Sequence, residues 1–166
     1  MSCSLLIYLR LMVEPAAVLA QDEDILLEFG PTLTILESQE EGVGLICVSP
    51  DYVLISALPQ YVEGLKKAYE EMYPADQGAA LGSDLYARII NLQLFNRIKG
   101  LLEKKKDKFL MGGRMDEEVL KVEPTVVLVK EGDVLVESET FGLILTIVDL
   151  EEEGFVRRAC DWVSRR

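Results

Sequence analysis

The end of the chain constrains its fold more than any other part. Leu143–Val148 is a run of aliphatic and β-branched residues, a composition typical of β-strands. An acidic connector, Asp149–Gly154, follows, and the chain closes on a mixed segment that contains Trp162. The apolar run predicts a strand, whereas hydrophobic spacing alone leaves Phe155–Val163 open between a helix and another strand.

Short apolar runs separated by turn residues indicate a small sheet in the first third of the chain. Ala16–Ala20, after Pro15, fits a short helical turn instead. The runs with strand composition are Leu5–Val13, Ile25–Phe29, Leu33–Glu37, Val43–Val48 and Tyr52–Ala57.

Two helices are predicted in the middle of the chain. One begins at Pro59 and ends before Pro74, with apolar residues at three- and four-residue spacing on one face. The small residues of Ala75–Gly82 suggest a linker. A longer helix is predicted over Asp84–Lys105, with Ser83 as its N-cap.

Strands are expected again at Val122–Lys130, Asp133–Glu137 and Leu143–Val148. Together the elements predict a mixed α/β (α+β) protein with a mixed sheet. We expect a small N-terminal sheet-plus-helix domain at residues 1–76 and a second α/β domain at residues 77–166.

Composition limits the chemistry that the chain can perform. It has 166 residues, a net charge of −12 and no histidine, which excludes Ser–His and Cys–His catalytic pairs. An acidic chain is a poor lone nucleic-acid binder but a suitable partner for a basic protein. No membrane-spanning run is found in the sequence, so we expect a cytoplasmic protein.

Cysteine spacing argues against a metal centre. Cys3, Cys47 and Cys160 are far apart and form no C-x-x-C pair, so they are interpreted as buried, reduced thiols. We therefore expect neither a metal nor a cofactor. The basic cluster Lys104–Lys108 fits the C-terminal end of a helix better than an RNA contact.

A resemblance to a known family comes from the end of the chain. Leu143–Asp149, then Glu153-Gly154, the pair Arg157-Arg158 and Trp162-Val163 resemble the closing segment of archaeal tRNA-splicing endonucleases. In that family a strand ending in Val-Asp leads through a short loop to a last strand. The resemblance implies a nuclease-like C-terminal domain and favours a strand over Phe155–Val163.

The resemblance also implies that this chain is not catalytic. Family members that cleave RNA use a tyrosine, a histidine and a lysine, whereas this chain has Glu123-Pro124 and Ser138–Phe141 at the histidine and lysine positions. It therefore resembles the structural subunit of a heterotetramer, a dimer of heterodimers with catalytic endonuclease subunits, which cuts precursor tRNA. The residues that would bind the catalytic subunit are Asp149, Glu151, Glu152, Glu153, Val156, Arg158 and Trp162.

Two alternatives remain open from the sequence. The chain fits an acidic adaptor, or nucleic-acid mimic, that binds a basic partner. A metal-dependent nuclease built on Glu118, Lys121 and Asp133 is a weaker candidate, because carboxylate–lysine pairs arise by chance on charged helices.

Overall fold

The structure is a computed structural model that describes residues 16–20, 50–56, 58–84, 86–137, 140 and 142–165, with the backbone alone at 16–20, 50, 51 and 77. The strands predicted over Leu5–Val13, Ile25–Phe29, Leu33–Glu37 and Val43–Val48 lie outside these residues.

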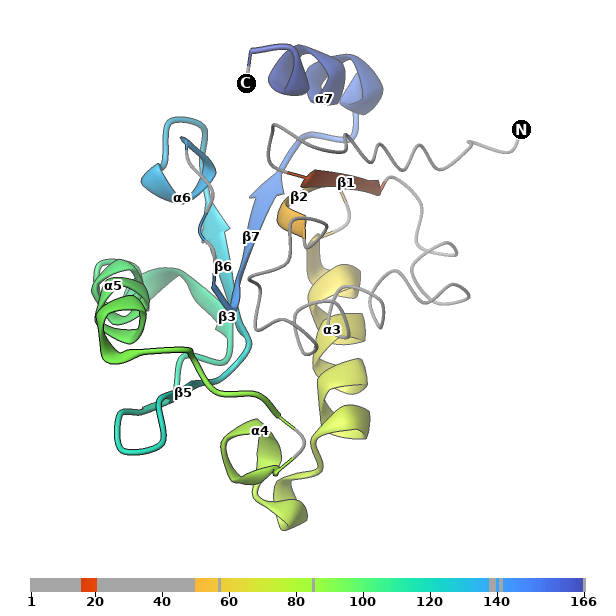
Figure 1. The fold of residues 1–166 in the computed structure, drawn as a ribbon. Coiled ribbons are helices and arrows are strands. Elements are labelled where there is room, and N and C mark those ends of the chain that lie inside the picture. Colours follow the sequence, from red (N-terminus) through yellow and green to blue (C-terminus); the bar gives the residue numbers. More distant parts are fainter. Residues whose placement is uncertain are drawn as a thin grey trace.

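A five-stranded mixed sheet organises the described residues (Figure 1). Its strand order is β1-β2-β7-β6-β3, in which β1, β2, β7 and β6 are parallel and β3 is antiparallel to β6. The mixed α/β class and the mixed sheet are therefore confirmed. The strands are β1 (Ala16–Ala20), β2 (Pro50–Ile55), β3 (Phe109–Met111), β6 (Thr125–Val129) and β7 (Ile144–Asp149).

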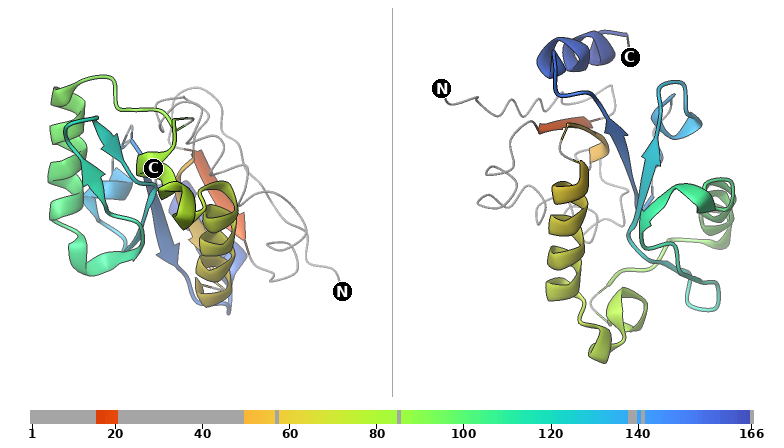
Figure 2. Two further views of the ribbon diagram at one scale, coloured as in Figure 1. Left: turned by 90° about the horizontal axis from the view of Figure 1, so that it is seen from below. Right: turned by 180° about the vertical axis from the view of Figure 1, so that it is seen from behind.

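Helices cover both faces of this sheet (Figure 2). On one face, Val53 and Ile55 of β2 pack with Tyr61 and Leu65 of helix α3 (Leu58–Met72). On the other face, a larger core includes residues of helix α5 (Leu92–Glu103). Strands β2, β6 and β7 consist almost entirely of buried residues, as expected for parallel strands covered on both sides.

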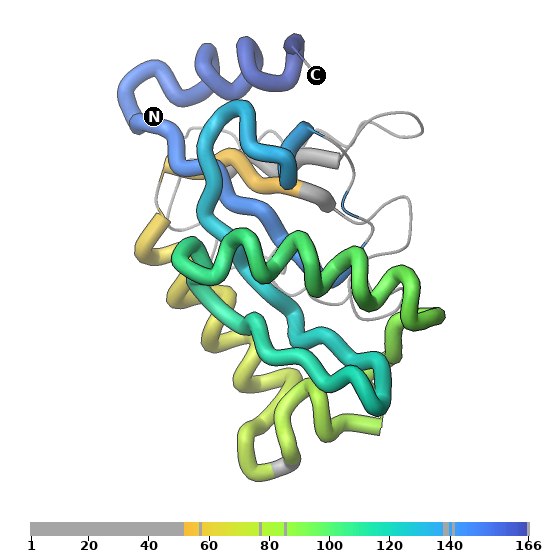
Figure 3. Tube along the Cα trace, turned by 90° about the vertical axis from the view of Figure 1, so that its left-hand side faces the viewer, coloured from red at the N-terminus to blue at the C-terminus, as the bar shows by residue number. Residues whose placement is uncertain are grey.

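Helix α7 (Phe155–Val163) lies across the end of the sheet opposite to helix α4 (Ala79–Gly82) (Figure 3). The strand expected over these last residues is wrong. Phe155, Ala159 and Trp162 are buried, and they follow the helical spacing that brings one stripe of a helix onto the core.

Three other expected elements differ from the structure. Ala16–Ala20 is strand β1 because it pairs in parallel with β2. Asp133–Glu137 contains the one-turn helix α6 (Val134–Glu137), not a strand. The predicted linker Ala75–Gly82 contains a 3₁₀ turn, η1 (Ala75–Gln77), and α4. In contrast, α3 and the three central strands appear where the sequence placed them.

The second predicted helix begins later than expected. Asn91, not Ser83, is the N-cap of α5, and its side-chain oxygen accepts a hydrogen bond from the Leu94 backbone N–H at 2.9 Å. Tyr86 and Ile89 are buried in the extended segment before the helix, which explains why their apolar character was mistaken for helical periodicity.

A short hairpin and a 3₁₀ turn complete the described elements. The hairpin pairs β4 (Met115–Asp116) with β5 (Lys121–Val122), and the turn η2 (Lys106–Lys108) follows α5. The five-stranded sheet joins strands from both sides of residue 76, while the division into two domains stays a prediction. No helix in the described ranges is long and apolar enough to cross a bilayer.

Candidate functional site

The parallel strands β2, β7 and β6 all begin at one edge of the sheet, which we call the N-terminal edge. Thr125 of β6 pairs with Ile144 of β7, and the Thr125 backbone N–H donates to the Leu143 carbonyl at 2.9 Å. In the described part of the chain this edge includes Glu123 and Pro124, which lead into β6, and Gly142 and Leu143, which lead into β7. The end of α3 and the hairpin lie beside it, because Glu123 bonds to Tyr69 and Arg114.

A buried carboxylate lies at this edge. Glu123 is only 4% exposed, and its Oε1 accepts hydrogen bonds from Tyr69 Oη and Arg114 Nη2, each at 2.7 Å. Its Oε2 accepts from the Arg114 backbone N–H at 3.2 Å. Tyr69 belongs to α3 and Arg114 precedes β4, so the carboxylate joins three separate segments.

The pKa values show that this cluster does not exchange protons at neutral pH. Burial by itself raises the pKa of Glu123, but the hydrogen bonds from Arg114 and Tyr69 outweigh it and lower the pKa from its ordinary value. Burial and the neighbouring carboxylate raise the pKa of Tyr69 to about 12. Glu123 is therefore ionised and Tyr69 neutral, an arrangement that positions groups and is unsuited to general acid–base catalysis.

A close backbone contact holds the hairpin against the same edge. Gly112 has φ +77°, and a Cβ built on it would lie 2.1 Å from the carbonyl oxygen of Pro124, so only glycine fits. The next residue, Gly113, donates its backbone N–H to Thr125 Oγ1 at 3.0 Å. The N-terminal edge is thus fixed by backbone contacts as well as by the Glu123 cluster.

We expect Arg114→Met to destabilise the protein by about 2 kcal/mol at neutral pH. The change leaves the Glu123 carboxylate buried without its cation, which costs ~3–5 kcal/mol for a fully buried pair and less here because Arg114 is largely in solvent. Urea unfolding at several pH values measures the effect.

The loss of stability in Arg114→Met should depend on pH. In the parent protein Glu123 has a lowered pKa, so its contribution to stability is present above pH 4.5 and is lost as the pH falls below that value. Without Arg114, burial raises the Glu123 pKa, and the deficit shrinks as the pH falls. Lys99→Met, which removes an exposed ion pair with Glu117, is the control. It should leave the midpoint urea concentration of unfolding unchanged. An equal loss of unfolding free energy in Arg114→Met and Lys99→Met would contradict a stabilising role for the buried Glu123 carboxylate.

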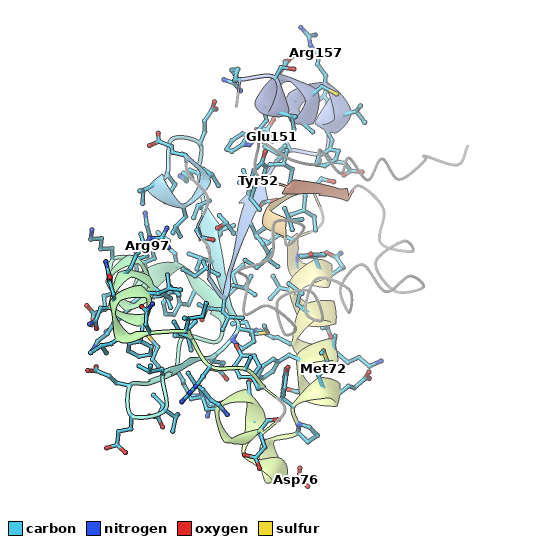
Figure 4. All side chains as sticks on the ribbon, viewed as in Figure 1. Tyr52, Met72, Asp76, Arg97, Glu151 and Arg157 are labelled. Atoms are coloured by element: carbon cyan, nitrogen blue, oxygen red, sulfur yellow. The ribbon has the colours of Figure 1, made fainter. Side chains whose placement is uncertain are left out.

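The opposite edge of the sheet carries the acidic connector. Asp149, Glu152 and Glu153 are exposed, and Glu151 pairs with Arg158 of α7 at 2.6 Å (Figure 4 labels Glu151). Val156 is 56% exposed, whereas Trp162 is 4% exposed. Val156, Arg158 and Trp162 therefore do not share the strand face predicted for partner binding. Whether the connector binds any partner stays a prediction.

The proposed metal-dependent nuclease site is not assembled. Lys121 Nζ donates to the carbonyl of Ser83 at 2.6 Å, Asp133 pairs with Lys105 at 2.5 Å, and Glu118 is exposed. Among the residues that the structure describes, no group of acids and cysteines has the arrangement of a metal site. Cys160 is exposed on α7, and Cys3 and Cys47 lie outside the described residues.

Comparison with known proteins gives a consistent result, although no family model matches the chain. It is 42% identical over 113 residues to the beta-apo-4'-carotenal oxygenase of Neurospora crassa, covering 66% of this chain and 21% of that protein. It is 37% identical over 128 residues to aldehyde dehydrogenase family 3 member B1 of Bos taurus, covering 75% of this chain and 26% of that protein. The chain thus spans about a quarter of these relatives' length.

A solved structure shows the same arrangement of elements. Staphylococcus aureus AldH, in a substrate-bound state, superposes with a TM-score of 0.75 at 23% identity, over 93% of this chain and 33% of that chain. The resemblance to tRNA-splicing endonucleases is therefore wrong, and so is the expected non-catalytic role in a heterotetramer that cuts precursor tRNA. The acidic adaptor and the metal-dependent nuclease are likewise unsupported. The chain therefore has part of an aldehyde dehydrogenase fold. The matching part corresponds to about a third of the AldH chain.

Proposed function

We propose that this chain is the aldehyde-reacting part of an oxidoreductase that converts apolar aldehydes to carboxylic acids. The observation that carries the proposal is the 42% identity to a beta-apo-4'-carotenal oxygenase, a protein named for a carotenal, which is an aldehyde.

The chemistry of aldehydes identifies the residue type that is needed. The carbonyl carbon is electrophilic, and a cysteine thiolate is the strongest nucleophile among ordinary side chains. A thiolate forms without histidine when positive charge or a helix N-terminus lowers its pKa, so the lack of histidine does not exclude this chemistry. The proposed step is addition of the thiolate sulfur to the carbonyl carbon, which leaves a negative oxygen that takes up a proton.

Among the three cysteines we assign this role to Cys47. Cys160 is exposed on α7, at the end of the sheet opposite to the N-terminal edge. Cys47 precedes Pro50, the first residue of β2, by three positions in the sequence. The strand that follows it begins at the N-terminal edge, which the Glu123 cluster and the Gly112 contact hold in place.

A nicotinamide dinucleotide would accept the hydride in such an oxidation. The N-termini of α5 and α7 do not fit its pyrophosphate, which requires free backbone N–H groups and no competing anion. The side chain of Asn91 already caps α5, and the carboxylates Glu151–Glu153 precede α7. We therefore assign no step to the dinucleotide within the described residues.

A reactive thiol also bears on localisation. The chain has cysteines that must stay reduced to react, and thiols persist in the reducing cytosol. We propose that the protein acts in the cytoplasm.

A burst assay tests the proposed function without any cofactor. The purified chain is mixed with a p-nitrophenyl ester of a long-chain fatty acid, which a nucleophilic thiol attacks to release p-nitrophenolate and form a thioester. We expect a burst close to the protein concentration, with the acyl group located on Cys47 by peptide mass spectrometry. Acylation spread equally over the three cysteines, or no burst, would refute the proposal.

A further inference from the structure

Two short elements lie together at the end of the molecule opposite to α7. They are α4 and the β4–β5 hairpin, which is separate from the five-stranded sheet (Figures 1 and 3). Helix α4 has four residues, and each strand of the hairpin has two, so neither element is stable in isolation. Both elements therefore depend on contacts with other parts of the chain.

Lys121 of β5 holds the C-terminal end of α4. Its Nζ donates to the Ser83 carbonyl at 2.6 Å and to the Leu81 carbonyl at 3.3 Å. The last carbonyl groups of a helix have no partner within the helix, and a lysine side chain can supply the missing donor. The hairpin thus completes the short helix.

The chain between α4 and α5 is attached to the same hairpin. Tyr86 Oη donates to the Val122 carbonyl at 2.7 Å, and the Ile89 backbone N–H donates to the Leu120 carbonyl at 2.8 Å. Contacts with the hairpin therefore extend from α4 almost to the start of α5. We call residues 79–84 and 86–90, together with hairpin residues 114–122, the flap.

Each half of the flap contains a strained residue. Ala79 has φ +54° and Leu120 has φ +55°, in the left-handed region that residues other than glycine rarely adopt. In the part of the chain that the structure describes, these two are the residues other than glycine with positive φ. Opening of the flap releases this strain, so specific contacts must keep it closed.

Tyr69 of α3 contacts both halves of the flap. Its Oη donates to Glu123 Oε1 at 2.7 Å and accepts the Ala80 backbone N–H at 3.4 Å. Glu123 closes the base of the hairpin, because its backbone N–H donates to the Arg114 carbonyl at 2.9 Å. Since α3 packs on the sheet, Tyr69 ties the flap to the rigid part of the molecule.

We propose that the flap opens as one cooperative unit while the five-stranded sheet stays folded, and that Tyr69 is the latch that keeps it closed. Proteins open locally in such units, which often coincide with small supersecondary motifs. Opening uncovers Tyr86 and Ile89, which are 2% and 0% exposed in the closed flap, next to the exposed residues Ile90 and Val119. The flap is thus a conformational device that presents an apolar surface, and it does not depend on the proposed function.

Amide hydrogen exchange followed by NMR tests this proposal on the full chain. The Ile89 amide reports the first half of the flap, and the Glu123 amide reports the hairpin. The Ile147 amide reports the sheet, because Ile147 lies in β7 between β2 and β6. Exchange rates give the opening constant at each of these amides.

The variants separate the contact between the two halves from the latch. Lys121→Met removes the donor that holds α4, and Tyr69→Phe removes only the latch hydroxyl. Tyr61→Phe is the matched control, because the Tyr61 hydroxyl on the same helix has no hydrogen-bond partner in the described part of the chain.

In the parent chain we expect Ile89 and Glu123 to share one opening constant within about threefold, well above that of Ile147. Lys121→Met and Tyr69→Phe should each raise both flap constants about tenfold, as for loss of a hydrogen bond to or from a charged group. Ile147 should not change in either variant, and Tyr61→Phe should match the parent at all three amides.

Several results would overturn the inference. Different opening constants at Ile89 and Glu123 would show that the halves open separately, and flap amides as slow as Ile147 would show that the flap opens only when the sheet unfolds. Acceleration of one half alone, equal acceleration of Ile147, or a Tyr69→Phe variant that exchanges like the parent would also contradict it.

Discussion

Replacement of Cys47 by serine is expected to reduce the p-nitrophenolate burst by at least about a thousandfold, because a serine hydroxyl stays protonated at neutral pH and is a far weaker nucleophile than a thiolate. The change removes one sulfur atom and adds one oxygen, so it hardly alters the volume of the side chain. Stopped-flow absorbance at matched protein concentrations measures the loss.

Cys160→Ser is the matched control for this prediction. Cys160 is exposed on α7, and its substitution should leave the burst at the parent level. If the two variants lose activity equally, the nucleophile is not Cys47. If Cys160→Ser alone loses the burst, the acylation is a surface reaction and the assignment is wrong.

Trp162→Ala is expected to destabilise the protein by about 3–5 kcal/mol, the usual cost of truncating a large buried aromatic residue. Trp162 is 4% exposed, and its ring centroid lies 6.5 Å from that of Tyr52 in β2. The side chain therefore carries much of the contact between α7 and the sheet. Urea unfolding followed by circular dichroism gives the change in free energy.

Val156→Ala is the control on the same helix. Val156 is 56% exposed, so its truncation should change stability by no more than about 0.5 kcal/mol. The pair discriminates between the observed helix and the strand first expected, since a strand would place Val156 and Trp162 on one face. Similar losses in both variants would contradict the helical arrangement of this segment.

The end of the chain contains a helical signal that is visible in its sequence. Phe155, Ala159 and Trp162 recur at helical spacing, which was visible in the sequence, and they are the residues that α7 buries. The resemblance to tRNA-splicing endonucleases favoured a strand over this periodicity, and that prediction is wrong. By contrast, α3 was predicted correctly because its apolar spacing agrees with Pro59 in its first turn and Pro74 just beyond its end.

Other errors reflect tertiary context that local patterns do not contain. Ala16–Ala20 is a strand because β2 offers it a pairing edge, although alanine favours helices. Asp133 forms a turn before α6, where its side chain accepts the Leu135 backbone N–H at 3.1 Å. The apolar residues Val134–Val136 favour a strand, but this side-chain hydrogen bond stabilises a turn instead.

The candidate site could be predicted only in part. Glu123 was named only as the residue at the histidine position of the resembled tRNA-splicing endonucleases, a resemblance that is wrong, and it was not predicted as part of a site. Its partners were missed, because the contact with Tyr69 spans 54 positions and depends on the packing of α3 against the hairpin.

The proposed function depends most on the reaction of one thiol with an aldehyde, and competitive labelling measures that reaction directly. The purified chain is treated with iodoacetamide in the presence of increasing amounts of a long-chain fatty aldehyde, and each cysteine is quantified by peptide mass spectrometry. We predict that the aldehyde protects Cys47 in a saturable manner, that the carboxylic acid of the same length does not, and that Cys160 is alkylated equally throughout. Alkylation of Cys47 at the same rate with and without aldehyde would contradict the account.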